Sequence, residues 1–114
     1  MSDSIFSRII RREIPADIVY EDERLIAFKD ISPQAPVHVL FVPKQHYSTL
    51  NDVPASEAEL LGRMMLAAAD YAKTQGFADR GYRLVMNCNR EGGQTVFHIH
   101  LHLLAGRTMD GGFG

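Results

Sequence analysis

The sequence predicts an α+β fold in which one short and one long helix pack on a largely antiparallel sheet of about five strands. Two observations predict this class. The apolar patterns follow the order helix, hairpin, strand, long helix and two strands. Near the C-terminal end, apolar residues then alternate with histidines over 97–103, which is the period of a β-strand. At 114 residues, the whole of 1–114 is expected to form one domain.

Composition narrows the class of function. The net charge of −2 gives no basic field for a nucleic-acid backbone, so no nucleic-acid partner is expected. No apolar run approaches the ~20 residues that cross a bilayer, and the N-terminus lacks a signal-peptide pattern, so no membrane association is expected. A single cysteine, Cys88, cannot form an intrachain disulfide. Together these features favour a cytoplasmic protein.

The first half of the chain predicts one helix and three strands. Asp3 or Ser4 can cap a short helix with apolar residues at helical spacing over 5–10, which Pro15 ends. Residues 18–20 and 25–28 form a predicted hairpin around the polar turn 21–23. A β-branched strand follows over 37–42, and within it His38 shares a face with Leu40 and Val42.

The long helix is predicted from Ser56, as the N-cap of a capping box with Glu59, to about Gln75. Gly76 suits the left-handed position after its end. Its apolar stripe is wider than one sheet face needs, and Gly62 would permit close approach of another helix. We therefore expect a homodimer, with deep burial of this helix in its own domain as the alternative.

The last two strands are predicted over 82–88 and along the histidine run, with a loop over 89–93 between them. His98, His100 and His102 would share one face of their strand, about 7 Å apart. That spacing lets three imidazoles serve one small ligand. The loop offers Gly92, Gly93, Gln94 and Thr95, whose backbone N–H groups, amide and hydroxyl suit phosphate oxygens.

Three interpretations of the histidine face remain open on residue types alone. The histidines could be purely structural, or they could bind zinc with His38 as a fourth ligand. Phosphorus chemistry fits more of the surroundings, because imidazole has an unperturbed pKa of ~6.5, so one ring can attack while another donates a proton. The donors before the strand favour this third interpretation.

The run 94–104 matches the His-φ-His-φ-His-φ-φ signature, where φ is apolar, of the histidine-triad (HIT) superfamily. The segments 30–38, 43–44, 81–83 and 105–107 further resemble its nucleotide-binding (Hint) branch, and the resemblance extends from Ile5 to Arg107. It implies a HIT-like fold that dimerises through the long helix and a strand. It also implies a purine nucleoside phosphoramidase, a hydrolase that cleaves the P–N bond of nucleoside 5′-phosphoramidates and also, as a further substrate class, aminoacyl-adenylates.

The resemblance also implies individual roles. His100 would become nucleotidylated, His102 would hold the phosphate and assist proton transfer, and His38 and His98 would orient the nucleophile. The nucleotide would be bound by ten further residues: Phe6, Ile9, Phe28, Lys29, Asp30, Ile31, Asn87, Gly93, Gln94 and Thr95. No metal would be required, although incidental zinc binding by the histidines stays open.

Two features depart from the family pattern. One is Lys29, which is next to Asp30, the residue that the resemblance assigns to the ribose hydroxyls. The other is the tail 108–114, which lacks the usual tryptophan and prolines. The alternatives to a phosphoramidase are a dinucleoside polyphosphate hydrolase of the same superfamily and a nucleotide-binding regulatory module.

Overall fold

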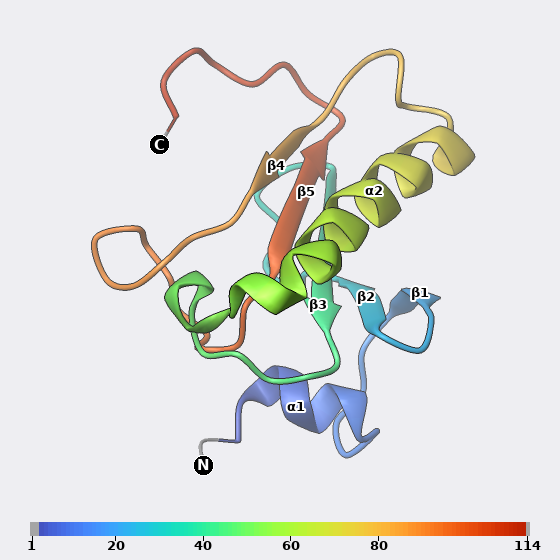
Figure 1. Ribbon diagram of the computed structural model, residues 1–114. Coiled ribbons are helices and arrows are strands. Elements are labelled where there is room, and N and C mark those ends of the chain that lie inside the picture. The colour runs from blue at the N-terminus through green and yellow to red at the C-terminus, as the bar shows by residue number, and fades with distance from the viewer. Residues whose placement is uncertain (1–2, 114) are drawn as a thin grey trace.

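The computed structural model describes residues 3–113 and confirms the predicted class and element order (Figure 1). Five strands form one sheet in the order β1-β2-β3-β5-β4, and all neighbours are antiparallel. The strands are β1 (Ile18–Glu21), β2 (Leu25–Lys29), β3 (Val37–Pro43), β4 (Arg83–Val85) and β5 (Leu101–Ala105). The helices are α1 (Ile5–Ile10) and α2 (Ala58–Gln75), with 3-10 turns at Leu50–Asp52 and Ala55–Glu57. Within residues 3–113, no helix combines the length and apolarity that crossing a membrane requires.

The long helix α2 covers one face of the sheet (Figure 1). Leu60, Met64 and Ala68 recur every four residues, so they lie on one side of α2 and are fully buried. They pack against alternate residues of β3 and β5, including Val39, Phe41, Leu101 and Leu103, and against Ile99 just before β5. Gly76 ends α2 in the left-handed conformation, with φ of 87°, as expected.

The short helix α1 packs on the opposite face of the sheet. Phe6 and Ile9 contact a second apolar cluster formed by Ile26, Phe28, Leu40 and Val42. Because β3 is covered on both faces, nearly all of its residues are buried. The face under α1 is the one that carries His38, Leu40 and Val42, as the alternation along this strand predicts.

The histidine strand is shorter than expected, because β5 begins only at Leu101. Its partner β3 ends at Pro43, and their pairing stops at Phe41 and Leu101. Beyond that point, the Ile99 N–H donates to the Tyr47 carbonyl, and the His98 side chain bonds the Pro43 carbonyl in place of a ladder bond. His98 and His100 therefore lie in irregular chain just before the strand.

Three other predicted boundaries were wrong. The strand predicted over 82–88 is only Arg83–Val85, because β5 offers partners no further than His102. The expected capping box at Ser56 is absent: a 3-10 turn occupies 55–57, and α2 begins at Ala58 without a side-chain cap. The first helix ends at Ile10, well before Pro15, because Arg12 adopts a left-handed φ of 63°.

Candidate active site

Four histidines gather on the α1 side of the sheet, around the junction of β3 and β5. His38 is opposite Leu104, and His102 is opposite Leu40, so the two imidazoles are diagonal neighbours on one face. The ring centroids of His38 and His102 are 5.1 Å apart, and those of His100 and His102 are 4.9 Å apart. The structure thus brings together the histidines that the alternation predicts.

Hydrogen bonds fix which nitrogen of His38 and His102 carries the proton. The backbone N–H of Gln34 donates to Nδ1 of His38 over 3.0 Å, so this nitrogen is an acceptor. The proton of neutral His38 then lies on Nε2, which donates to Nδ1 of His102 over 2.9 Å. His102 must therefore keep its own proton on Nε2. The hydrogen bonds that run from the Gln34 N–H through His38 to His102 are called the relay below. The relay ends in the Nε2–H of His102, which is a proton donor.

His100 has the opposite arrangement. Its Nδ1–H donates to the His98 carbonyl over 2.8 Å, which leaves an unprotonated lone pair on Nε2. The side chain is only 6% exposed, and burial lowers the pKa of this imidazole below its ordinary value. His100 is therefore neutral at pH 7, with a nitrogen nucleophile beside the proton donor of His102.

Burial also keeps His102 and His38 neutral. Burial, followed by the nearby His100 and His38, lowers the pKa of the His102 imidazole to about 4. Burial likewise lowers the pKa of His38, although the Asp30 carboxylate partly opposes this effect. The assignment of one proton to each of these rings thus holds at neutral pH.

His98 is fully buried and holds the site together. Its Nε2–H donates to the Pro43 carbonyl over 2.8 Å, so Nδ1 is an acceptor. Two hydroxyl oxygens lie within reach of Nδ1, Ser4 Oγ at 3.0 Å and Ser7 Oγ at 3.3 Å. Burial lowers the pKa of His98 to about 4.

The sequence did not reveal three of the residues around His98. Ser4 was expected only as a helix cap, and Ser7 had no expected role. His46 lies outside the histidine run, but its ring is half-buried and packs edge-on against His98, with centroids 4.8 Å apart. Its Nε2–H donates to the Phe97 carbonyl. No local pattern marks these contacts, because they join residues 51 or more positions apart.

The carboxylate of Asp30 lies beside the relay. Its Oδ2 is 3.5 Å from Nε2 of His38, and its Oδ1 accepts the backbone N–H of Ser32 over 2.8 Å. A pocket of about 360 Å³ is lined by this aspartate and His38, along with Lys29. Lys29 lies at the surface and pairs with Asp17, with nitrogen and oxygen 3.5 Å apart.

Apolar residues flank the histidines on the α1 side. Phe6 packs edge-on against Phe28 and against His100, with centroid distances of 5.4 and 4.9 Å. Ile9 is buried in the same cluster. Ile31, in contrast, is 93% exposed, so its side chain is free to contact a ligand.

Hydrogen bonds hold the loop before the histidines in place. The Gln94 side chain donates to the Ser48 and Val96 carbonyls and accepts the Asn89 N–H. The backbone N–H groups of Gly93 and Gln94 also bond within this turn, contrary to the expectation that they would be free phosphate donors. Gly93 closes the turn with a left-handed φ of 81°. Within residues 3–113, no hydrogen bond links Asn87, Gly93 or Thr95 to a histidine.

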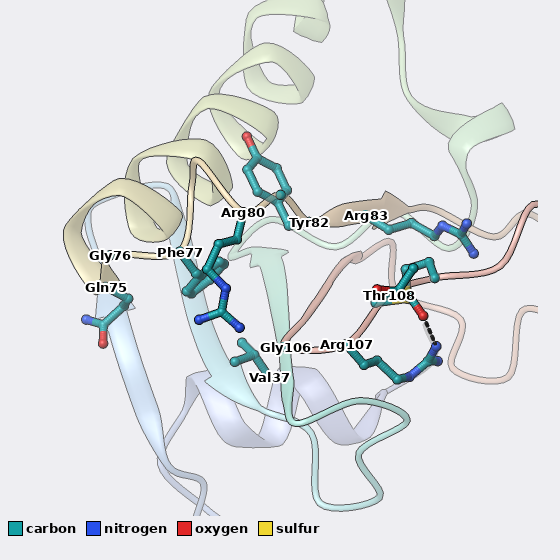
Figure 2. Close-up of a pocket in the computed structure, with 12 residues that line it drawn as sticks. Val37, Gln75, Gly76, Phe77, Arg80, Tyr82, Arg83, Gly106, Arg107 and Thr108 are labelled. Carbon is teal, nitrogen blue, oxygen red and sulfur yellow. Dashed lines mark hydrogen bonds between the residues drawn. The ribbon is translucent and has the colours of Figure 1, made fainter.

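Figure 2 shows a larger pocket, of about 650 Å³, that no histidine lines. It lies between the end of α2, the start of β4 and the chain after β5, and it is lined by Arg80, Arg83 and Arg107. Arg83 donates to the Asp110 carbonyl and packs over the Phe113 ring, and Arg107 donates to the Thr108 and Gln34 carbonyls. The groups suited to acid–base and nucleophilic chemistry are those of the histidine cluster.

Asp30, His38 and His102 could also hold a metal ion, because one ligand atom from each lies within 4.8 Å of the others. Two imidazoles and a carboxylate are a donor set that zinc accepts. The same imidazole nitrogens carry the relay hydrogen bond.

Known proteins are similar to this chain along nearly its whole length. The HIT domain family model matches residues 11–109. The purine nucleoside phosphoramidase of Escherichia coli strain K12 is 57% identical over 107 residues, which are 94% of this chain and 90% of that protein. An uncharacterized HIT-like protein of Synechocystis is 54% identical over 105 residues, covering 92% and 91% of the two chains.

Solved structures are similarly close. A HIT family hydrolase from Legionella pneumophila has a TM-score of 0.94 and 49% identity, covering 96% of this chain and 98% of its own. A histidine triad protein from Clostridium difficile has a TM-score of 0.93 and 43% identity, with 96% of each chain covered. With a family model matched over most of its length and relatives of this identity, the chain belongs to the HIT domain family.

Proposed function

We propose that this chain is a purine nucleoside phosphoramidase, a hydrolase that cleaves the P–N bond of nucleoside 5′-phosphoramidates. One observation carries the proposal: a buried neutral imidazole with a free Nε2 lone pair, His100, adjoins a proton donor, Nε2–H of His102. A reaction at phosphorus that expels an amine needs this pair of groups. The Escherichia coli relative bears the same activity in its name.

In the first step, Nε2 of His100 attacks the α-phosphorus and the P–N bond breaks. The bound phosphate anion raises the pKa of His102, so this ring takes up a solvent proton as the substrate binds. The leaving amine takes a proton from Nε2 of this imidazolium and departs neutral. The positive charge that develops on His100 is stabilised by the His98 carbonyl, which accepts its Nδ1–H. This transfer returns His102 to the neutral form.

In the second step, water attacks the phosphorus of nucleotidyl-His100 and the P–Nε2 bond breaks. The proton of this water returns to Nε2 of His102, and a 5′-mononucleotide leaves. The 2.9 Å hydrogen bond to His38 holds the His102 ring in place throughout, and the added proton returns to solvent as the product leaves. Both imidazoles are then restored to their starting state.

The nucleotide is proposed to lie between α1 and the loop after β2. Asp30 would bind the ribose hydroxyls beside Lys29, and Thr95, with Asn87, Gly93 and Gln94, would line the phosphate side. Phe6, Ile9, Phe28 and Ile31 would contact the base. The exposure of Ile31 and the carboxylate of Asp30 beside His38 support this placement. Residues 1–114 are proposed as a single cytoplasmic domain.

No cofactor is required in this proposal, because His100 supplies the nucleophile and His102 the proton. Both nitrogens of His38 are engaged, because Nδ1 accepts from Gln34 and Nε2–H donates to His102, so zinc on Asp30, His38 and His102 would displace one of these hydrogen bonds. Zinc binding is therefore proposed to be incidental and inhibitory.

A homodimer through α2 and the edge strand β4 is proposed from the surface of α2. Gly62, Met65, Leu66 and Ala69 follow helical spacing, and Leu66 is 72% exposed while Met65 is 52% exposed. An added Cβ at Gly62 meets no atom within 4 Å. A stripe of this kind gives another helix an apolar surface for close approach.

Replacing His100 by asparagine tests the nucleophile. The asparagine amide could still donate to the His98 carbonyl, but it has no nucleophilic nitrogen, so kcat should fall by at least about 10³-fold. The measurement is kcat on adenosine 5′-phosphoramidate, with a thermal unfolding curve as the control for folding. A folded His100→Asn variant with wild-type kcat would contradict the assignment.

Activity should persist in acid below the ordinary histidine pKa. Attack requires neutral His100, and burial lowers its pKa, so kcat/KM should stay level as the pH falls through ~6.5 and decline only in more acidic solution. The measurement is a pH profile of kcat/KM, corrected for ionisation of the substrate. A decline centred at pH 6.5 or above would show that His100 is not held neutral.

Metal removal should not reduce turnover. Dialysis against excess EDTA is expected to leave kcat unchanged, whereas micromolar zinc should lower it. Magnesium at the same concentration is the control, because it prefers oxygen ligands and should have little effect. Loss of activity in EDTA with recovery on adding zinc would favour a zinc-dependent enzyme.

The dimer is tested by Leu66→Glu, which places a charge in the exposed stripe of each copy. Sedimentation analysis should show a dimer for the wild type and a monomer for this variant. Thr74→Glu adds the same charge on α2 outside the stripe and should remain dimeric. If the wild type sediments as a monomer, the proposed dimer is refuted.

A further inference from the structure

The hydroxyl of Ser4 links helix α1 to the histidine cluster. Its oxygen accepts the Ser7 N–H at the start of α1, over 3.0 Å, which is the N-cap interaction. The same oxygen is 3.0 Å from Nδ1 of His98. A hydroxyl both accepts and donates, so one side chain satisfies the two contacts at once.

The direction of the bond to His98 is determined by its other nitrogen. The Pro43 carbonyl can only accept, so Nε2 of His98 carries the proton and Nδ1 accepts one. Ser4 therefore donates to His98, which is the nearer of two acceptors within its reach; the other is Ser7 Oγ, 3.2 Å away. The other titratable rings that face His98 are His46 and His100. Neither contributes a hydrogen bond to Nδ1 among the described residues.

The position of His98 in turn determines that of His100. The carbonyl of His98 accepts Nδ1–H of His100, and this bond keeps the Nε2 lone pair free. Rotation of the buried His98 ring would break its hydrogen bond to the Pro43 carbonyl. A proton on Nδ1 would either break the same bond or make His98 a buried cation. Either change would displace the carbonyl that orients the nucleophile.

From these contacts we infer that Ser4 is a positioning residue for the reaction: as a donor, it holds His98 in the tautomer that keeps His100 aligned. This inference rests on the proposed function of His100. Ser4 thus both caps α1 and donates a hydrogen bond to His98. A capping side chain without a hydrogen to donate, such as a carboxylate, cannot make the second contact. Ser7 Oγ, 3.3 Å from Nδ1, provides a weaker second donor.

The variant Ser4→Asp separates the two tasks. Aspartate is as good an N-cap as serine, but its carboxylate only accepts, so it demands a proton on Nδ1 of His98. Ser4→Thr keeps both functions and serves as the rescue variant. Ser56→Asp adds the same charge near the start of α2, at an exposed residue outside the site, as the matched control.

Nitrogen-15 NMR of the imidazoles, without substrate, reports the tautomer directly. In the wild type, Ser4→Thr and Ser56→Asp, His98 should carry its proton on Nε2 alone. In Ser4→Asp, Nδ1 should become protonated, and kcat should fall at least about tenfold with a smaller change in KM. A thermal unfolding curve serves as the control that this variant is folded.

If Ser4→Asp does not fold, Ser4→Gly removes the hydroxyl at little cost to the helix. It should lower kcat and populate both neutral tautomers of His98. Wild-type tautomer and kcat in either variant would overturn the inference. The proposed function has a separate test: it is refuted if the wild-type protein does not hydrolyse adenosine 5′-phosphoramidate. The tautomer measurement does not depend on that result.

Discussion

The hydrogen bond between His38 and His102 depends on the antiparallel register of β3 and β5, and the site depends on this bond. A shift of one residue in that register would turn His102 to the α2 side of the sheet and bury it among leucines. The apolar residues between the histidines prevent such a shift, because Leu101 and Leu103 fill the α2 side. The packing of the core thus fixes the relative positions of the His38 and His102 imidazoles.

Burial is the second constraint, because it keeps the four imidazoles uncharged. Four imidazoles within a few ångströms would repel one another if protonated, and desolvation lowers the pKa of each. Each neutral ring has one donor and one acceptor nitrogen. The surrounding carbonyls and the Gln34 N–H then determine where every proton lies. The resulting asymmetry leaves His100 with a free Nε2 lone pair and His102 with an Nε2–H, as the proposed reaction requires, although the side chains are identical.

Much of this arrangement could be predicted from the sequence, because its signals are local. Alternation located the histidine face, and Gly76 located the end of α2. The start of β5 could not be predicted, because it depends on where Pro43 ends the partner strand. Ser4 and His46 were missed as site residues for a similar reason: each meets His98 through tertiary contacts that no spacing encodes.

The central claim is that His100 becomes covalently nucleotidylated, and a quenched-flow experiment tests it most directly. Enzyme mixed with adenosine 5′-phosphoramidate is quenched during turnover, digested, and analysed by mass spectrometry under conditions that preserve phosphoramidate bonds. The account predicts one adenylyl group per chain, attached to His100. Turnover that proceeds with no adenylated peptide at any quench time, or with the group on another residue, would contradict it.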